Sequence, residues 1–321
     1  MPNTNAAATS WNAPNYVGEL YLIGANQTPF LNQIGGLQGG NVKLVGDMQF
    51  ALAQTYALES AAQPAITETD SLTRPTAWTY VRGVDYNTCH IVHKSVDVSY
   101  VKQSVVGQVT ADPTTGLIDI MGGGQPVRNE RDFQIQAALE QIAIDTEYTF
   151  LHGAYQQATA ANVAAKTRGI VTACSTNAVA AGNAQLSRSL INQLVRTMAG
   201  NGAIFRNIMM FCNSYQRQRI SEIFGYAPPS RTVGGVEIST VMVDFVMMDV
   251  VWCPKLDTDT VLLADLSVCS PVYLPVPEKG VLFYEPLDPG GASEVGQIYG
   301  QIGLDYGPEE YHGKITGLAT S

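Results

Sequence analysis

The sequence predicts an α+β fold. Three features predict it: a hairpin of alternating apolar and polar residues over 46–86, a long helix over about 128–156, and a mixture of helices and strands over 183–271. An apolar period of two indicates strands and a period of 3.6 indicates helices, so both kinds of element occur in this chain. With 321 residues, the chain is long enough for one large domain or two modest ones with a sizeable core.

Residues 1–45 are predicted to form an N-terminal arm. They are rich in Asn, Ala, Gly and Gln, and the glycine pairs at 35–36 and 39–40 loosen the end of the segment. A segment with so few apolar residues cannot build a core alone. Its aromatic side chains, Trp11, Tyr21 and Phe30, are therefore expected to pack on something larger. We also expect the rest of the chain to fold without residues 1–40.

The hairpin over 46–86 carries large apolar side chains on one face of each strand. They are Phe50, Leu52, Tyr56 and Leu58 on the first strand, and Trp78, Tyr80, Val84 and Tyr86 on the second. A two-stranded hairpin is marginal in water by itself, so this face needs a surface to lie on. That surface is either its own domain or a neighbouring subunit, and we predict the neighbour. The side chains predicted to make contacts between subunits are Trp11, Phe30, Phe50, Tyr56, Trp78 and Tyr80.

A strand over 91–101 precedes the long helix. Pro126 is well placed for the first turn of that helix, where proline is favoured. Placed at 100° per residue, the apolar side chains of the helix form two opposed stripes. One stripe holds Ile135, Leu139, Ile142 and Phe150 within about 80° of arc, and the other holds Phe133, Ala137, Ile144, Tyr148, Leu151 and Tyr155. A helix with two apolar stripes is covered on two sides, as a central spine would be.

The region over 183–271 begins with a helix that Ser187 or Ser189 can cap and that ends near Ala199. A strand over 205–212 follows, and then a helix over 215–224 with Ser214 as its N-cap. The run over 241–253 is apolar on both faces apart from two aspartates, which predicts a central strand. From residue 272 the chain returns to strands that proline and glycine interrupt.

The sequence offers no recognisable catalytic or metal site. It contains no GxSxG, P-loop or HExxH pattern. His90 and His93 would face opposite sides of a strand, and the pair Asp257 and Asp259 lacks the glycine and glutamate of a calcium loop. We therefore expect a protein that is not an enzyme, with no catalytic residues, no cofactor and no metal ligands.

Charge and cysteine usage narrow the function further. The net charge is −10 and there is no basic run, which argues against a protein that neutralises nucleic-acid phosphates. The five cysteines are widely spaced and odd in number, which predicts reduced thiols in a protein made in a cytoplasm. We expect no signal peptide, because the N-terminal residues have neither a basic start nor an apolar core. We expect no membrane span, because no apolar stretch approaches the roughly 18 residues that cross a bilayer.

The order of the segments and several local sequences resemble the major capsid proteins of tailed double-stranded DNA bacteriophages. The resemblance rests on TPFLNQIGG at 28–36, NTCHIVHKSVDVSY at 87–100, ERDFQIQAALEQIAIDTEYTFLHG at 130–153, KTRGI at 166–170 and GPEEYHGKITGL at 307–318. It implies the tailed-phage major capsid fold. The implied parts are an N-arm (1–45), an E-loop hairpin (46–86), a P-domain with the spine helix (87–182), an A-domain (183–271) and strands returning to the P-domain (272–321).

The resemblance also implies a function and partners. The chain would form hexamers and pentamers of an icosahedral shell that encloses the phage DNA, assembled in the host cytoplasm. A separate scaffolding protein, a portal and a decoration protein are the implied partners, with only non-specific proximity to DNA and no membrane. Some family members cross-link through an E-loop lysine, but no lysine occurs here between Lys43 and Lys94, so we expect a non-covalent shell. Two alternatives stay open: an encapsulin-like nanocompartment shell and a phage tail structural protein.

Overall fold

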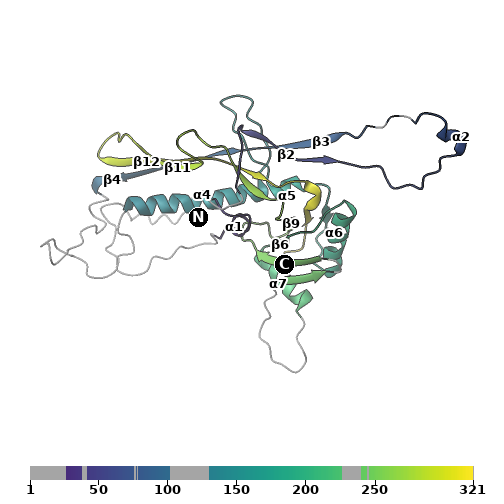
Figure 1. The fold of residues 1–321 in the computed structure, drawn as a ribbon. Coiled ribbons are helices and arrows are strands. Elements are labelled where there is room, and N and C mark those ends of the chain that lie inside the picture. Colours follow the sequence, from purple (N-terminus) through teal and green to yellow (C-terminus); the bar gives the residue numbers. More distant parts are fainter. Residues whose placement is uncertain are drawn as a thin grey trace, which may run out of the picture.

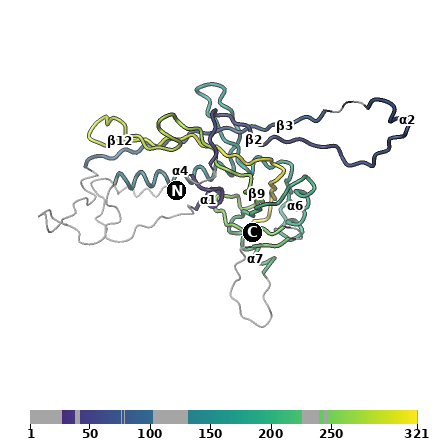
Figure 2. The backbone as a smooth tube through the Cα atoms, in the orientation of Figure 1, coloured from purple at the N-terminus to yellow at the C-terminus, as the bar shows by residue number. Residues whose placement is uncertain are grey.

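The computed structural model describes residues 27–37, 42–75, 77, 79–101, 130–225, 240–243 and 246–320. Within these residues the chain forms two lobes, each built on one β-sheet, and a long hairpin that projects from the body (Figure 1). The backbone trace shows the long helix and the hairpin extending to opposite sides of the molecule (Figure 2). No helix in this described part combines the length and the apolar character that a bilayer span requires.

The first lobe is a five-stranded sheet with the helix α4 (Glu130–His152) along one face. Its central strand is β12 (Ser293–Asp305), which pairs antiparallel with β4 on one edge and with β11 and β10 in succession on the other. β1 adds to β10 in parallel. An ion pair of 3.0 Å between Lys94 and Asp145 places that side of β4 against α4. The remaining strands are β1 (Lys43–Leu44), β4 (His90–Ser99), β10 (Ser270–Tyr273) and β11 (Leu282–Leu287).

The second lobe is a six-stranded sheet in the order β5-β13-β9-β6-β8-β7. The helices α6 (Arg188–Gly200) and α7 (Ser214–Phe224) supply buried side chains to the same core as this sheet, among them Leu194, Met198 and Ile220. The strands are β5 (Ala178–Ala180), β6 (Ile208–Cys212), β7 (Thr240–Val243), β8 (Val246–Trp252), β9 (Val261–Asp265) and β13 (Gly313–Thr316). A short helix, α5 (Ile170–Ala173), lies between the lobes in the sequence.

Local sequence signals explain most boundaries in the second lobe. Of the two predicted caps, Ser187 is the N-cap of α6, and its side chain accepts a hydrogen bond from the amide of Leu190. The N-cap of α7 is Asn213, and the prediction of Ser214 was wrong by one residue. The run over 241–253, predicted as one central strand, is two antiparallel strands. β8 lies inside the sheet between β6 and β7, as a central strand would, but β7 is at the edge, and Met242 and Met247 are exposed on one face.

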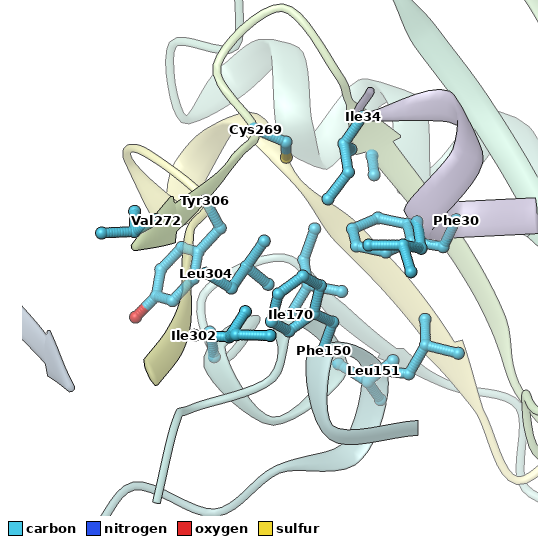
Figure 3. Close-up of a cluster of buried hydrophobic side chains, with 14 of the residues drawn as sticks. Phe30, Ile34, Phe150, Leu151, Ile170, Cys269, Val272, Ile302, Leu304 and Tyr306 are labelled. Carbon is cyan, nitrogen blue, oxygen red and sulfur yellow. The ribbon is translucent and has the colours of Figure 1, made fainter. Parts of the chain in front are cut away.

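The segment after residue 28 is part of the subunit core, and the expectation of an arm without a core does not hold for it. The helix α1 (Pro29–Gln33) inserts Phe30, Leu31 and Ile34 among buried side chains. Figure 3 shows Phe30 and Ile34 pointing into the cluster that contains Phe150 of α4. β1 then ties the chain to the first sheet. The arm residues 1–26 lie outside the described part of the chain.

The long helix is buried more on one side than on the other. Ile142 and Phe150 of the first predicted stripe have no exposed surface, although Leu139 is exposed. In the second stripe Leu151 is buried, whereas Tyr148 is 58% exposed in the single subunit. The subunit alone therefore covers the first stripe at its core end and leaves part of the second stripe open.

The hairpin consists of β2 (Gln49–Tyr56) and β3 (Arg82–Thr88), joined by a long connection that holds α2 (Glu68–Ser71). A register shift between Ala51 and Gln54 interrupts the pairing, so the predicted regular alternation is broken by a bulge. The second strand begins at Arg82 and not near residue 78. Thr67 and Asp70 form a capping box around α2, which explains the helical turn at the tip.

Candidate functional site: surfaces available for assembly

A cluster of buried hydrogen bonds fixes the base of the hairpin to the body. The side chain of Asn87 donates to the carbonyl of Leu304 at 2.7 Å and accepts from the amide of Arg168 at 2.8 Å. The hydroxyl of Thr167 donates to the carbonyl of Thr88 at 2.6 Å. Asn87, Thr88 and Thr167 are all buried, and satisfied buried polar groups of this kind hold one geometry. The direction in which the hairpin leaves the body is thus set within the subunit.

Beyond this base the hairpin exposes apolar side chains to solvent. No described residue over 54–83 is buried. Tyr56 is 65% exposed, Tyr80 is 52% exposed and Leu72 is 85% exposed, and Leu58, Ile66 and Val81 are exposed as well. Apolar side chains gathered on an exposed surface mark interaction sites. A two-stranded hairpin that buries nothing along most of its length gains little stability from its own subunit.

A cleft separates the hairpin from the second lobe. Its volume is about 650 Å³, and the strand ends near Tyr56 and Gly83 line one wall. Asn201 and Gly202, which follow α6, and the 3-10 turn η1 (Glu309–Tyr311) line the other. A smaller adjoining cavity of about 230 Å³ adds Asp85 and Glu309. The lining mixes amide, hydroxyl and carboxylate side chains with small apolar ones such as Ala57 and Val81, and the residues that line it include neither histidine nor cysteine.

The structure separates the six predicted contact residues into three groups. Tyr56 and Tyr80 lie exposed on the hairpin, where a neighbour can reach them. Phe30 is fully buried and Phe50 is 7% exposed, so both serve the core of their own subunit, and the prediction that they contact a neighbour does not fit them. Trp11 and Trp78 lie outside the described residues.

Sequence reasoning missed two exposed apolar sites. Leu72 follows the turn α2 in a stretch that reads as polar. Met242 and Met247 pair across β7 and β8, and the sequence alone suggested that both faces of this run were covered. The usable signal was Asp244, a charged residue that interrupts the apolar run in the sequence.

The two histidines at metal-ligand spacing in the sequence, His90 and His93, do not meet in the structure. His90 contacts buried Thr167 and His93 contacts Gln297 on the exposed face, so the two histidines diverge. All five cysteines are buried thiols outside disulfides, and burial raises the pKa of Cys89 to about 12, which keeps its thiol protonated. Within the described part of the chain, no three or more His, Cys, Asp or Glu side chains are grouped to hold a metal ion.

Solved structures with the same fold are shells. A capsid of cyanophage A-1(L) matches with 13% identity and a TM-score of 0.63, covering 99% of this chain and 100% of the other. A capsid of a native GTA particle matches with 13% identity and a TM-score of 0.60, covering 98% of both chains. An encapsulin from Synechococcus elongatus matches with 11% identity and a TM-score of 0.56, covering 97% of this chain and 93% of the other. None of the curated proteins matches the sequence.

These likenesses establish the fold, and at such low identities they do not separate a phage head from a nanocompartment. The family comparison favours the phage head. The model of the SU10 major capsid protein family matches residues 3–319, which is nearly the whole sequence. A capsid family implies a structural role in a virion and assembly with further copies of the chain. This chain, with its projecting hairpin and its helix-backed sheet, belongs to the SU10 major capsid protein family.

Proposed function

We propose that the chain builds the icosahedral head shell of a tailed phage around double-stranded DNA, and that the distal hairpin carries contacts between neighbouring copies. The observation that carries the second part is the exposure of every described residue over 54–83, apolar side chains included. Chain entropy opposes ordering such a segment by about 1–2 kcal/mol per residue. Burial on a neighbour offsets that cost.

A charge placed at the hairpin tip tests this proposal. Leu72→Asp introduces a carboxylate at a side chain that is 85% exposed, so the isolated subunit should unfold at the same temperature as the wild type. Shell yield, measured by sedimentation and electron microscopy, should fall at least tenfold, because burying the charge against a neighbour is costly. The matched control is Gln63→Asp, which adds the same charge at an exposed polar position of the same connection. Wild-type shell yield from L72D would show that the tip is not an interface.

Finer partners extend the proposal. We propose hexamers and pentamers as the capsomers, a separate scaffolding protein, a portal and a decoration protein as partners, and assembly in the host cytoplasm. The acidic chain and the absence of any basic run favour a shell lining that encloses DNA without binding its phosphates tightly. We also propose that the subunit performs no catalysis. Co-expression with candidate scaffolding proteins, followed by counting closed shells, tests whether a second chain is required.

A nanocompartment shell is the second candidate, because the encapsulin from Synechococcus elongatus shares the fold over nearly the whole chain. The contents of particles from the native source discriminate the two functions. Double-stranded DNA inside the particles supports the phage head. An enzyme cargo without DNA supports the nanocompartment.

A further inference from the structure

A carboxylate on the long helix is buried against the start of α1. The side chain of Glu147 accepts hydrogen bonds from two consecutive amides, that of Phe30 at 3.0 Å and that of Leu31 at 2.6 Å. The thiol of Cys253 donates to the same carboxylate at 3.5 Å. Glu147 has no exposed surface, and about 116 residues separate it from its backbone partners. Its described hydrogen-bond partners therefore come from segments that are remote in the sequence.

Burying a carboxylate in this place is costly. Burial raises the pKa of Glu147, and the amides of Leu31 and Phe30 and the thiol of Cys253 act in the opposite direction. No cationic side chain of the described residues appears among the groups that influence this pKa. An uncompensated buried charge costs several kcal/mol, so the two amides are needed whenever this side chain stays buried and ionised. An apolar side chain would fill the same space without that cost.

The segment held by Glu147 also joins the two lobes. The ring of Phe30 meets that of Phe211 edge-on, with ring centroids 5.4 Å apart. Phe211 lies on β6 of the second lobe and Glu147 lies on α4 of the first, while Cys253 directly follows β8. α1 therefore contacts both lobes. Two of its backbone amides are hydrogen-bonded to Glu147, which belongs to the first lobe.

We propose that Glu147 is a positioning residue that latches α1 between the two lobes. The latch fixes the position of α1, and through α1 it connects the long helix to the sheet of the second lobe. It is a property of the single subunit, so it can hold or fail independently of shell formation.

The test is amide hydrogen exchange on the full-length subunit carrying Glu147→Gln. Glutamine has the same shape, but only one of its two terminal atoms accepts a hydrogen bond, so one of the two amides loses its partner. Exchange of the amides over 28–34 should accelerate at least tenfold, while the amides of β6 and β12 keep their wild-type protection. The matched control is Glu140→Gln, an exposed glutamate on the same helix, which should change neither.

Two results would overturn the latch. One is exchange over 28–34 within twofold of the wild type, which would show that the carboxylate does not hold α1. The other is equal acceleration over both sheets, which would show that Glu147 supports the whole subunit without a local role. If E147Q does not give soluble subunits, Glu147→Asp replaces it, because it keeps the charge and withdraws the oxygens by one methylene. The same two regions are then compared.

Discussion

Buried polar side chains in this subunit join segments that are far apart in the sequence. Asn87 and Glu147 do so at the hairpin base and at α1. His312 does so between the lobes: its Nε2 donates to the carbonyl of Tyr306 at 2.6 Å, and its Nδ1 accepts from the amide of Asp265 at 3.2 Å. These two bonds require one neutral tautomer of the ring. Burial lowers the pKa of His312, which agrees with that neutral form.

His90 provides a pH prediction. Burial lowers the pKa of His90 to about 4, and the charge of Asp145 partly opposes the shift. The unfolded chain therefore binds a proton between pH 6.5 and 4 that the folded subunit does not. His90 therefore does not reduce the free energy of unfolding above pH 6.5. This free energy decreases as the pH falls from 6.5 towards 4, because the unfolded chain is stabilised by binding the proton. His90→Gln should flatten the dependence of the unfolding free energy on pH in this window, by at most about 1.4 kcal/mol per pH unit.

Chemical denaturation of isolated subunits at several pH values measures this effect. His93→Gln is the control, because His93 is exposed on the same strand. Equal slopes for H90Q and wild type would contradict the prediction. His312 acts in the same direction as His90, so some pH dependence should survive in H90Q.

At the residue scale, sequence reasoning found the sites whose cause is local. Ser187 could be predicted as a cap because its partner amide lies three residues away. Glu147 could not, because a glutamate on a long helix reads as a solvent-exposed charge until α1 is placed beside it. Phe30 was misassigned for the same reason: its partner ring, Phe211, is supplied by a distant strand.

At the scale of elements, substitutions on the two sides of α4 should have different effects, one on folding and the other on assembly. Ile142 has no exposed surface, so Ile142→Asp should destabilise the subunit by roughly 3–5 kcal/mol and give little soluble protein. Tyr148 is 58% exposed, so Tyr148→Asp should leave the subunit folded and reduce shell assembly. Circular dichroism and sedimentation distinguish folding from assembly. Normal shells from Y148D would show that this side of the helix stays open in the particle.

Helices and strands could be predicted where a single apolar periodicity extended over the whole element. The 23 residues of α4 lie inside the predicted range, and the strand leaving the hairpin was placed within a residue or two. The prediction of one strand over 241–253 was wrong because a single long strand and two antiparallel strands give the same apolar pattern. Only the pairing of β7 with β8 shows that one face carries exposed methionines.

At the scale of the molecule, the arm divides at α1. Deleting residues 1–26 leaves Phe30, Leu31 and Ile34 in place, so the subunit should unfold at the wild-type temperature. Deleting residues 1–36 removes all three from the core and should cost at least about 4 kcal/mol, at roughly 1.5–3 kcal/mol for each buried side chain. Thermal unfolding of the two truncated chains checks this. Equal stability of the two would show that α1 contributes nothing.

The chemistry of the assembled shell follows from the lysine positions. With no lysine between Lys43 and Lys94, the hairpin cannot supply an amine for a covalent link to its neighbour. The five cysteines are buried in the subunit, so their thiols cannot reach a neighbour to form a disulfide. Denaturing electrophoresis of mature particles should therefore show a single band near 34.4 kDa, with and without reductant. A ladder of cross-linked bands would contradict this.

β13 lies inside the six-stranded sheet, between β5 and β9, although it is the last strand in the sequence. While a ribosome is still translating residues 313–316, β5 has no partner in the sheet and one edge of β9 is open. The second lobe therefore cannot close during synthesis of the preceding strands. A nascent chain that already carries the hairpin residues therefore still lacks a complete second lobe until β13 has been made.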